Sequence, residues 1–209
     1  MTIASHETTS SAFTWTTYLL ATHPSVQTRL RDEIKSRLPT NPGPEVELAQ
    51  LLESLPLLNA VCNETLRLYP TVPITTRNSI RPTTILGTYV PPNTQILICS
   101  WAINRSPSLW GPSASQFNPD RWINADGKPN NNGGAESNYA ITTFLHGPRS
   151  CIGKDFAKAE LRCLVAAFVG AFEMELGMPP ENIIPAGVVT TKPREGMKLR
   201  LKVLDRGEM

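Results

Sequence analysis

The sequence lacks the patterns that mark several common classes of protein. None of its four cysteines stands in a C-x-x-C pair, which argues against a zinc ribbon or a thioredoxin-like redox site. No basic segment followed by an apolar core opens the chain, and the longest apolar stretch, 161–172, contains an arginine and is too short to span a bilayer. The 20 basic and 18 acidic residues nearly balance and are scattered, so no nucleic-acid partner is expected.

The first part of the chain has the periodicity of helices. Val26, Leu30, Ile34 and Leu38 recur every four residues behind Pro24, a favoured first residue of a helix. With a hydrophobic content of 40%, the chain can build a sizeable core. Helices are predicted over 7–22, 24–38, 48–52, 57–68 and 154–172.

The remainder predicts short strands and loops. Runs at 83–86 and 95–99 flank a Pro-Pro-Asn segment and are interpreted as one hairpin with a wide turn. Further short strands are predicted near 172–176, 188–191 and 197–203, and 124–137 reads as a polar surface loop. The expected fold is therefore mainly α with small β hairpins (α+β).

One segment places a single cysteine at the end of a Gly/Pro loop directly before an apolar helix. It reads Phe-Leu-His-Gly-Pro-Arg-Ser-Cys-Ile-Gly over 144–153. Gly147 permits a tight turn, Gly153 lets the backbone approach a flat ligand, and Arg149 can bind a carboxylate. Cys151, close to a helix N-terminus, would gain dipole stabilisation and backbone N–H donors for its thiolate. The other three cysteines are interpreted as small buried hydrophobic residues.

This segment resembles the haem-binding loop of the cytochrome P-450 family, F-x-x-G-x-R-x-C-x-G, at every specified position. The resemblance implies haem b (iron protoporphyrin IX) as cofactor, with Cys151 as the axial ligand of the iron. It implies that Phe144, Gly147, Arg149 and Gly153 belong to the cofactor-binding loop. A buried structural cysteine in a glycine-rich loop is the alternative.

Further positions fit the same family when they are taken in order along the chain. Glu64 and Arg67 form an E-x-x-R pair on a predicted helix, and Arg121 lies in Phe-Asn-Pro-Asp-Arg-Trp, between that pair and the cysteine loop. The resemblance implies that these three side chains form a structural network behind the haem. A solvated surface pair is the alternative. Arg77 stands where the family commonly has a second propionate-binding arginine, and 72–75 and the tail near Val188 resemble segments that line the substrate pocket.

The start of the chain, Ala-Ser-His-Glu-Thr over 4–8, resembles the family's oxygen-activation motif A-G-x-[DE]-T. Glu7 and Thr8 match the acid and the alcohol that relay protons to dioxygen. Ser5 stands in place of the glycine that widens the oxygen groove. Read without the family, the same residues could cap a helix.

The resemblance implies a monooxygenase that inserts one oxygen atom from dioxygen into a small, apolar organic substrate, with electrons from NADPH-cytochrome P-450 reductase. The fold would be the C-terminal, proximal half of the cytochrome P-450 fold, and residues 1–209 a partial domain that begins within the distal oxygen-binding helix. Membrane contact would lie only in the upstream part, at the cytosolic face of the endoplasmic reticulum. The alternatives are a family member that rearranges its substrate without external dioxygen, and a haem-binding or inert fragment without catalysis.

Overall fold

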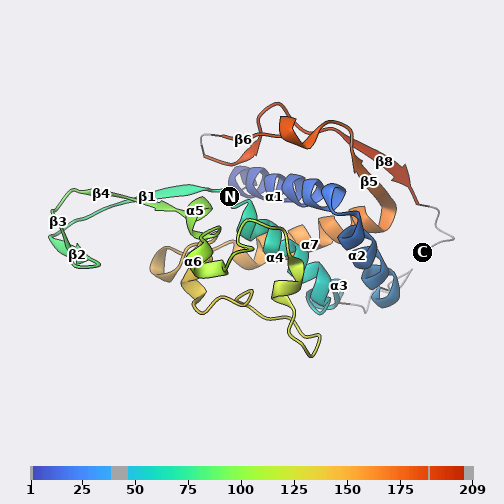
Figure 1. The fold of residues 1–209 in the computed structure, drawn as a ribbon, viewed down its shortest axis with the longest axis horizontal. Helices are drawn as coiled ribbons and strands as arrows, with labels where there is room; N and C mark the ends of the chain where they lie inside the picture. The colour runs from blue at the N-terminus through green and yellow to red at the C-terminus, as the bar shows by residue number, and fades with distance from the viewer. Residues whose placement is uncertain (1, 39–46, 188, 205–209) are drawn as a thin grey trace.

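The computed structural model describes residues 2–38, 47–187 and 189–204, with the side chains of 2–5 left out of the description. Helices dominate, and the strands pair two by two into small antiparallel ladders (Figure 1). This confirms the predicted fold class, mainly α with small β hairpins. The α-helices are α1 Thr2–Thr22, α2 Pro24–Arg37, α3 Leu48–Glu53, α4 Pro56–Leu68, α5 Ser100–Ile103, α6 Pro107–Trp110 and α7 Lys154–Ala171. The short 3-10 helices in the described residues are η1 Pro119–Trp122, η2 Asn138–Ala140, η3 Gly147–Arg149 and η4 Pro180–Asn182.

The core lies where α1, α2, α4 and α7 pack together. Each of these helices contributes fully buried apolar side chains, including Leu20, Leu30, Val61 and Val165. Their burial removes apolar surface from water, at about 25 cal/mol per Å², and this fixes the four helices against one another. The helical periodicity of the sequence therefore predicted the four helices that build the core.

Polar side chains tie the core helices to the chain that follows α7. Gln27 on α2 donates to Met174 O at 3.0 Å and accepts from Met174 N at 2.9 Å. Arg31, one turn later, donates to Val169 O at 3.2 Å and to Phe172 O at 3.1 Å, so its guanidinium satisfies carbonyl groups at the end of α7. On the surface, Arg29 forms a bidentate ion pair with Asp120 that joins α2 to η1.

The strands in the described part of the chain form antiparallel pairs, β1 Ile74–Asn78 with β4 Gln95–Cys99, β2 Thr83–Ile85 with β3 Thr88–Val90, β5 Phe172–Leu176 with β8 Leu199–Val203, and β6 Pro185–Ala186 with β7 Lys192–Pro193. The predicted pairing of 83–86 with 95–99 is wrong, because each run pairs with a different partner. A tight Leu-Gly turn closes the inner hairpin, and Arg77 pairs with Ile96 in the outer one. Residues 189–191 contain no strand, contrary to prediction, and Val188 lies outside the described residues.

Thr191 connects three distant parts of the chain. Its carbonyl accepts hydrogen bonds from Ser11 and, at 2.9 Å, from the Trp15 indole, both on α1. Its amide donates to Thr71 O at 2.8 Å, in the segment that leaves α4. The C-terminal region thereby fixes α1 beside the segment after α4, and this places both at one cavity.

Candidate functional site

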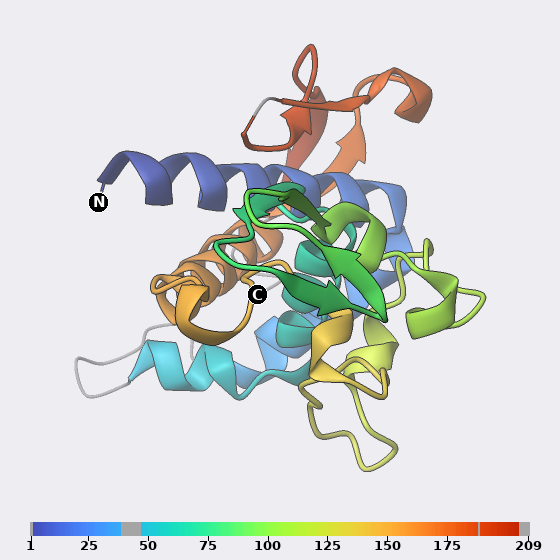
Figure 2. The same cartoon turned by 90° about the vertical axis from the view of Figure 1, so that its left-hand side faces the viewer.

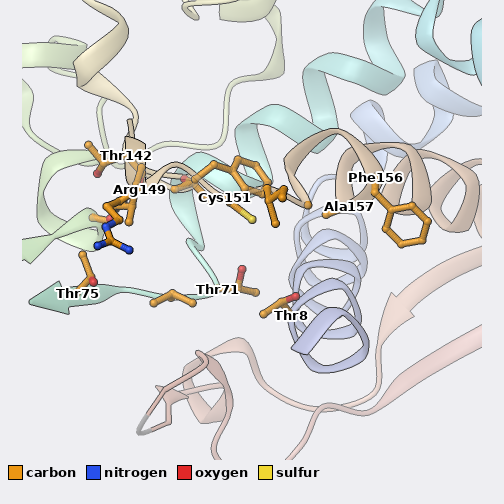
Figure 3. A pocket seen from close by; sticks show the side chains of 15 residues that line it. Thr8, Thr71, Thr75, Thr142, Arg149, Cys151, Phe156 and Ala157 are labelled. Atoms are coloured by element: carbon orange, nitrogen blue, oxygen red, sulfur yellow. Dashed lines mark hydrogen bonds between the residues drawn. The ribbon is translucent and has the colours of Figure 1, made fainter. Parts of the chain in front are cut away.

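A cavity of about 750 Å³ lies between α1 and the loop that precedes α7. Figure 3 shows side chains from several elements converging on it. Helix α1 contributes Thr8, the chain around β1 contributes Thr71, Val72 and Thr75, and α5 contributes Ser100; the remaining lining residues are Thr142, Thr143, Phe144, Leu145, Arg149, Cys151, Ile152, Gly153, Phe156 and Ala157. The size is that of a small-molecule or cofactor site, and apolar groups with a few polar ones make up the wall.

Cys151 presents its thiol to this cavity. The amide of Cys151 donates to Phe144 O at 2.8 Å, which closes the loop 144–151 and turns the side chain toward the open space (Figure 3). The closure requires left-handed backbone at Gly147, with φ +70°, and at Leu145, with φ +58°. A leucine in this conformation is strained, and such strain is concentrated at functional sites.

The thiol lies three residues before the first residue of α7. Gly153 is the N-cap of that helix, so the positive end of its dipole faces the sulfur region, as the sequence predicts. Within the described residues, the thiol itself receives no hydrogen bond from a backbone N–H group, so the predicted N–H donors to the thiolate stay a prediction. A Cβ built on Gly153 would lie 4.0 Å from Sγ. Glycine therefore leaves open the space beside the sulfur.

Two arginines predicted to bind carboxylates lie near the cavity in different ways. Arg149 lines it and is exposed, and among the described carboxylates none pairs with its guanidinium. In Figure 3 the guanidinium points toward Thr75. Arg77, two residues further along β1 and on the same face as Thr75, does not line the cavity, and its guanidinium donates to Thr76 O at 2.8 Å.

Thr8 and Glu7 face different surroundings. Thr8 lines the cavity from α1, on the side opposite the loop that carries Cys151 (Figure 3). Glu7 is not part of the lining; its carboxylate accepts from the Thr190 hydroxyl at 2.8 Å and lies 3.9 Å from Lys192 Nζ. Of the pair predicted for proton delivery, the structure thus brings only Thr8 to the cavity.

Glu64 and Arg67 lie at the centre of a buried polar network on α4. Both side chains have no exposed surface, so the surface-pair alternative is wrong. Arg67 donates through Nε and Nη2 to the two carboxylate oxygens, each at 2.8 Å. Glu64 also accepts from Arg121 Nε at 3.0 Å and from the indole of Trp122 at 2.9 Å. The carboxylate and the guanidinium are both charged and well bonded, which is the condition for a buried ion pair to be tolerated.

Arg67 extends the network to three backbone carbonyls. Its Nη1 donates to Asn104 O at 2.7 Å and to Ala114 O at 2.6 Å, and Nη2 donates to Gln116 O at 3.2 Å. With the two bonds to Glu64, every N–H of the guanidinium has an acceptor. The arginine therefore fixes the course of the chain between α5 and η1.

Asn104 is a residue that sequence reasoning missed. It is completely buried, and its amide nitrogen donates to Arg67 O at 3.0 Å and to the Thr143 hydroxyl at 2.8 Å. Its amide oxygen accepts from Thr142 N at 2.9 Å. Thr142 and Thr143 directly precede Phe144, so Asn104 connects the buried ion pair to the loop that presents Cys151. In the sequence Asn104 is one uncharged polar residue in an irregular stretch, which gives no signal of this role.

The cysteines differ in their surroundings. Cys62 on α4 is buried, and this burial raises the pKa of its thiol to about 12. Cys151 and Cys163 are exposed, so the prediction of a buried Cys163 is wrong. Cys163 lies on α7 and is not among the lining residues. Cys151 is therefore the cysteine that the cavity exposes to a ligand.

The cavity has the chemical groups that a haem requires. An exposed thiol can supply a thiolate to iron, and the unpaired guanidinium of Arg149 can bind a propionate. Ile152 and Phe156 border the cavity with 93% and 66% of their surface exposed, which is unusual for such large apolar side chains. A flat apolar macrocycle would cover them. The residues present fit the cofactor that the sequence predicts.

Comparison with known proteins points to the same cofactor as the thiol, the guanidinium and the apolar side chains of the cavity. The cytochrome P-450 family model matches residues 1–199. The chain is 49% identical over 202 residues to the cytochrome P-450 monooxygenase ptmK of Penicillium ochrochloron, covering 96% of this chain and 39% of that protein. It is 50% identical over 198 residues to the monooxygenase sphH of Aspergillus fumigatus, covering 93% of this chain and 36% of that protein. It thus spans less than half the length of these curated relatives.

Proposed function

Because the chain belongs to the cytochrome P-450 family, we propose that it forms the thiolate-bearing side of a haem-dependent monooxygenase in which Cys151 is the axial ligand of the iron. The observation that carries the proposal is the Cys151 thiol, exposed to a cavity of about 750 Å³ with Thr8 on the opposite wall. We also propose that α1 belongs to the distal oxygen-binding helix of the family.

Some residues of the chain would bind the haem, and others position the loop that carries Cys151. Cys151 would hold the iron as a thiolate, and Arg149 would bind a propionate of haem b. Arg77 would bind a second propionate if its guanidinium left Thr76 O. Glu64, Arg67 and Arg121 hold the chain behind the loop, while Phe144, Gly147 and Gly153 shape it. When bound, the haem supplies the chemistry of dioxygen activation, with insertion of one oxygen atom into an organic substrate.

We assign proton delivery to two residues of α1, Glu7 and Thr8. The Thr8 side chain faces the cavity and can hold a proton at its hydroxyl oxygen. Glu7 is half-exposed, so its carboxylate can exchange protons with solvent and pass them to the neighbouring Thr8. The apolar lining favours a small, apolar substrate.

Members of this family take electrons from a separate redox partner, and we propose NADPH-cytochrome P-450 reductase for this chain. Among the described residues, no helix is long and apolar enough to cross a membrane. We place the parent protein at the cytosolic face of the endoplasmic reticulum.

The test of the thiolate is a spectrum of the reduced, carbon monoxide-bound protein after haem loading. The wild-type chain should give the strongly red-shifted band of a thiolate-ligated haem, and Cys151→Ser should lose it. Cys163→Ser is the matched control, because it removes an exposed cysteine outside the cavity, and it should keep the band. A band that survives Cys151→Ser would refute the ligand assignment.

A second function, haem binding without turnover, is favoured by one observation. Cys151 is itself exposed in the described structure, so water can reach its sulfur. Product formation with reductase, NADPH and isotopically labelled dioxygen separates the functions. Labelled product supports the monooxygenase, a rearranged product without label supports the isomerising alternative, and a thiolate spectrum without product supports haem binding alone.

A further inference from the structure

Strand β1 connects the cavity with the ladder that it forms with β4. The two strands project from the helical body, and β1 begins close to that body (Figures 1 and 2). Side chains alternate along β1, so Thr75 and Arg77 share its half-buried face, whereas Ile74 and Thr76 lie on the other face. Among these residues, Thr75 lines the cavity and Arg77 does not. Thr75 is therefore the residue of this face that a ligand in the cavity would meet.

The Thr75 hydroxyl is bonded to one guanidinium and faced by another. Nη1 of Arg77 donates to Thr75 Oγ1 at 3.3 Å, in addition to its bond to Thr76 O at 2.8 Å. Within the cavity, the Arg149 guanidinium points toward Thr75 (Figure 3). A hydroxyl that accepts one hydrogen bond keeps its own O–H to donate. Thr75 can thus accept from Arg77 and donate into the cavity at the same time.

The charges around this hydroxyl suit an anionic ligand. Neither Arg77 nor Arg149 has an ion pair among the described residues. The parts of the sequence that carry the two arginines, 65–119 and 137–154, contain no aspartate or glutamate. Of the described residues that line the cavity, Arg149 is the charged one and none is acidic. A carboxylate at this end of the cavity would therefore meet positive charge without a competing acid.

A hydroxyl that accepts from a guanidinium is a better donor than an isolated one. Hydrogen bonds in series polarise one another, so the positive charge of Arg77 strengthens the bond that the Thr75 O–H can donate. A bond from this hydroxyl to an ionised carboxylate is charge-assisted, and such bonds are shorter and stronger than neutral ones. Arg77 can in this way act on a ligand that its own side chain does not reach.

We propose that, while Arg77 stays bonded to Thr76 O, Thr75 donates to the haem propionate that Arg149 neutralises, and that Arg77 acts on this carboxylate through the Thr75 hydroxyl. The inference rests on the proposed function, because it takes haem as the ligand of the cavity. Thr75 is then a cofactor-binding residue, and Arg77 is a positioning residue that acts through it.

The first test measures the rate at which haem leaves the loaded chain for an excess of apomyoglobin. Thr75→Val removes the hydroxyl but keeps a β-branched side chain, and it should speed haem release roughly tenfold, as expected for the loss of one charge-assisted bond. Thr75→Ser keeps the hydroxyl and should release haem as slowly as wild type. Thr76→Val makes the same change on the other face of β1 and should also leave the rate unaltered. Equal release from wild type and Thr75→Val would overturn the proposal.

Haem dimethyl ester separates recognition of the carboxylate from packing against the porphyrin. Both propionates are capped in this compound and carry no charge, so wild type and Thr75→Val should release it at similar rates. If the tenfold difference persists with the ester, the hydroxyl does not act on a carboxylate and the proposal is wrong.

A double-mutant cycle tests the path from Arg77. Arg77→Met should speed haem release in the wild-type chain but add little in the Thr75→Val chain, because its effect passes through the hydroxyl. An equal effect of Arg77→Met in both chains would mean that Arg77 binds the carboxylate itself, and would overturn the path through Thr75.

The carbon monoxide spectrum distinguishes failure of this inference from failure of the haem proposal. Every variant should keep the red-shifted band, since none of them changes Cys151. A red-shifted band with equal haem release from wild type and Thr75→Val would overturn this inference alone, whereas a chain that takes up no haem would overturn both.

Discussion

Arg67 and Asn104 bind each other in both directions. Nη1 of Arg67 donates to the Asn104 carbonyl at 2.7 Å, and Nδ2 of Asn104 donates to the Arg67 carbonyl at 3.0 Å. Because Asn104 also holds Thr142 and Thr143, this reciprocal pair is a direct structural link between α4 and the loop of Cys151. The buried ion pair therefore helps to hold the loop that positions the Cys151 thiol.

Replacing Asn104 with alanine should destabilise the protein by about 2–4 kcal/mol, since several buried hydrogen bonds, each worth about 1 kcal/mol, are lost. It should also reduce the fraction of haem with the thiolate spectrum. Asn59→Ala is the control, because the Asn59 amide donates to Glu53 O and Leu55 O and accepts from Arg162 on α7 at 3.1 Å, and none of these bonds reaches residues 142–151. If both variants alter the spectrum equally, the positioning role of Asn104 is wrong. Urea unfolding and the carbon monoxide spectrum provide the two measurements.

Arg67→Met should cost about 3–5 kcal/mol of unfolding free energy, because it leaves the Glu64 carboxylate buried without its main partner. Arg29→Met removes the same kind of side chain from an ion pair that is about half-exposed, and should cost less than about 1 kcal/mol. The contrast is measured by urea denaturation of both variants. Similar losses of unfolding free energy in the two variants would mean that the buried Glu64 carboxylate does not need Arg67 as its partner.

The Arg29–Asp120 pair predicts a specific pH dependence. The hydrogen bond from Arg29 lowers the pKa of the Asp120 carboxyl below its usual 3.8. A carboxyl with a lowered folded-state pKa contributes stability above its unfolded pKa, and loses it as pH falls through the folded value. Asp120→Asn should therefore lower the melting temperature slightly at pH 7. The difference from wild type should disappear in strong acid, and a difference that persists there would contradict the electrostatic origin.

Gly133→Ala should destabilise the buried polar network through two indoles, because Trp122 donates to Glu64 and the ring of Trp110 lies 4.8 Å from Cζ of Arg67. Gly133 has φ +61°, and a Cβ there would meet Trp110 at 2.9 Å and Trp122 at 3.0 Å. Displacing these rings adds to the backbone strain, for a loss of about 2–4 kcal/mol. Gly134→Ala separates the two effects, since Gly134 has φ +78° but no atom within 4 Å of an added Cβ. Thermal melts should show the larger loss for Gly133.

The sequence predicted most helices and the set of residues around the cysteine, because periodicity and a dense motif are local signals. The hairpins were paired wrongly, since the partner of 95–99 is the weakly apolar segment 74–78, which has no strong strand signal. Asn104 and Gly133 were missed for a similar reason. Asn104 matters because it bonds Arg67 and Thr142, and Gly133 matters because two indoles pack against it. These partners do not lie next to either residue in the sequence, so no local pattern points to them.

The Thr191 carbonyl, which receives Ser11 and the Trp15 indole, also has a consequence for the order of folding. Ser11 and Thr191 are 180 residues apart, so their contact closes nearly the whole chain. Contacts of such separation form late, because the entropy of the long intervening loop must be lost first. During synthesis, α1 can pack against α2 and α4 early, but its hydrogen bonds to Thr191 can form only after residues around 191 have emerged. Loading of a cofactor would then be among the last steps of maturation.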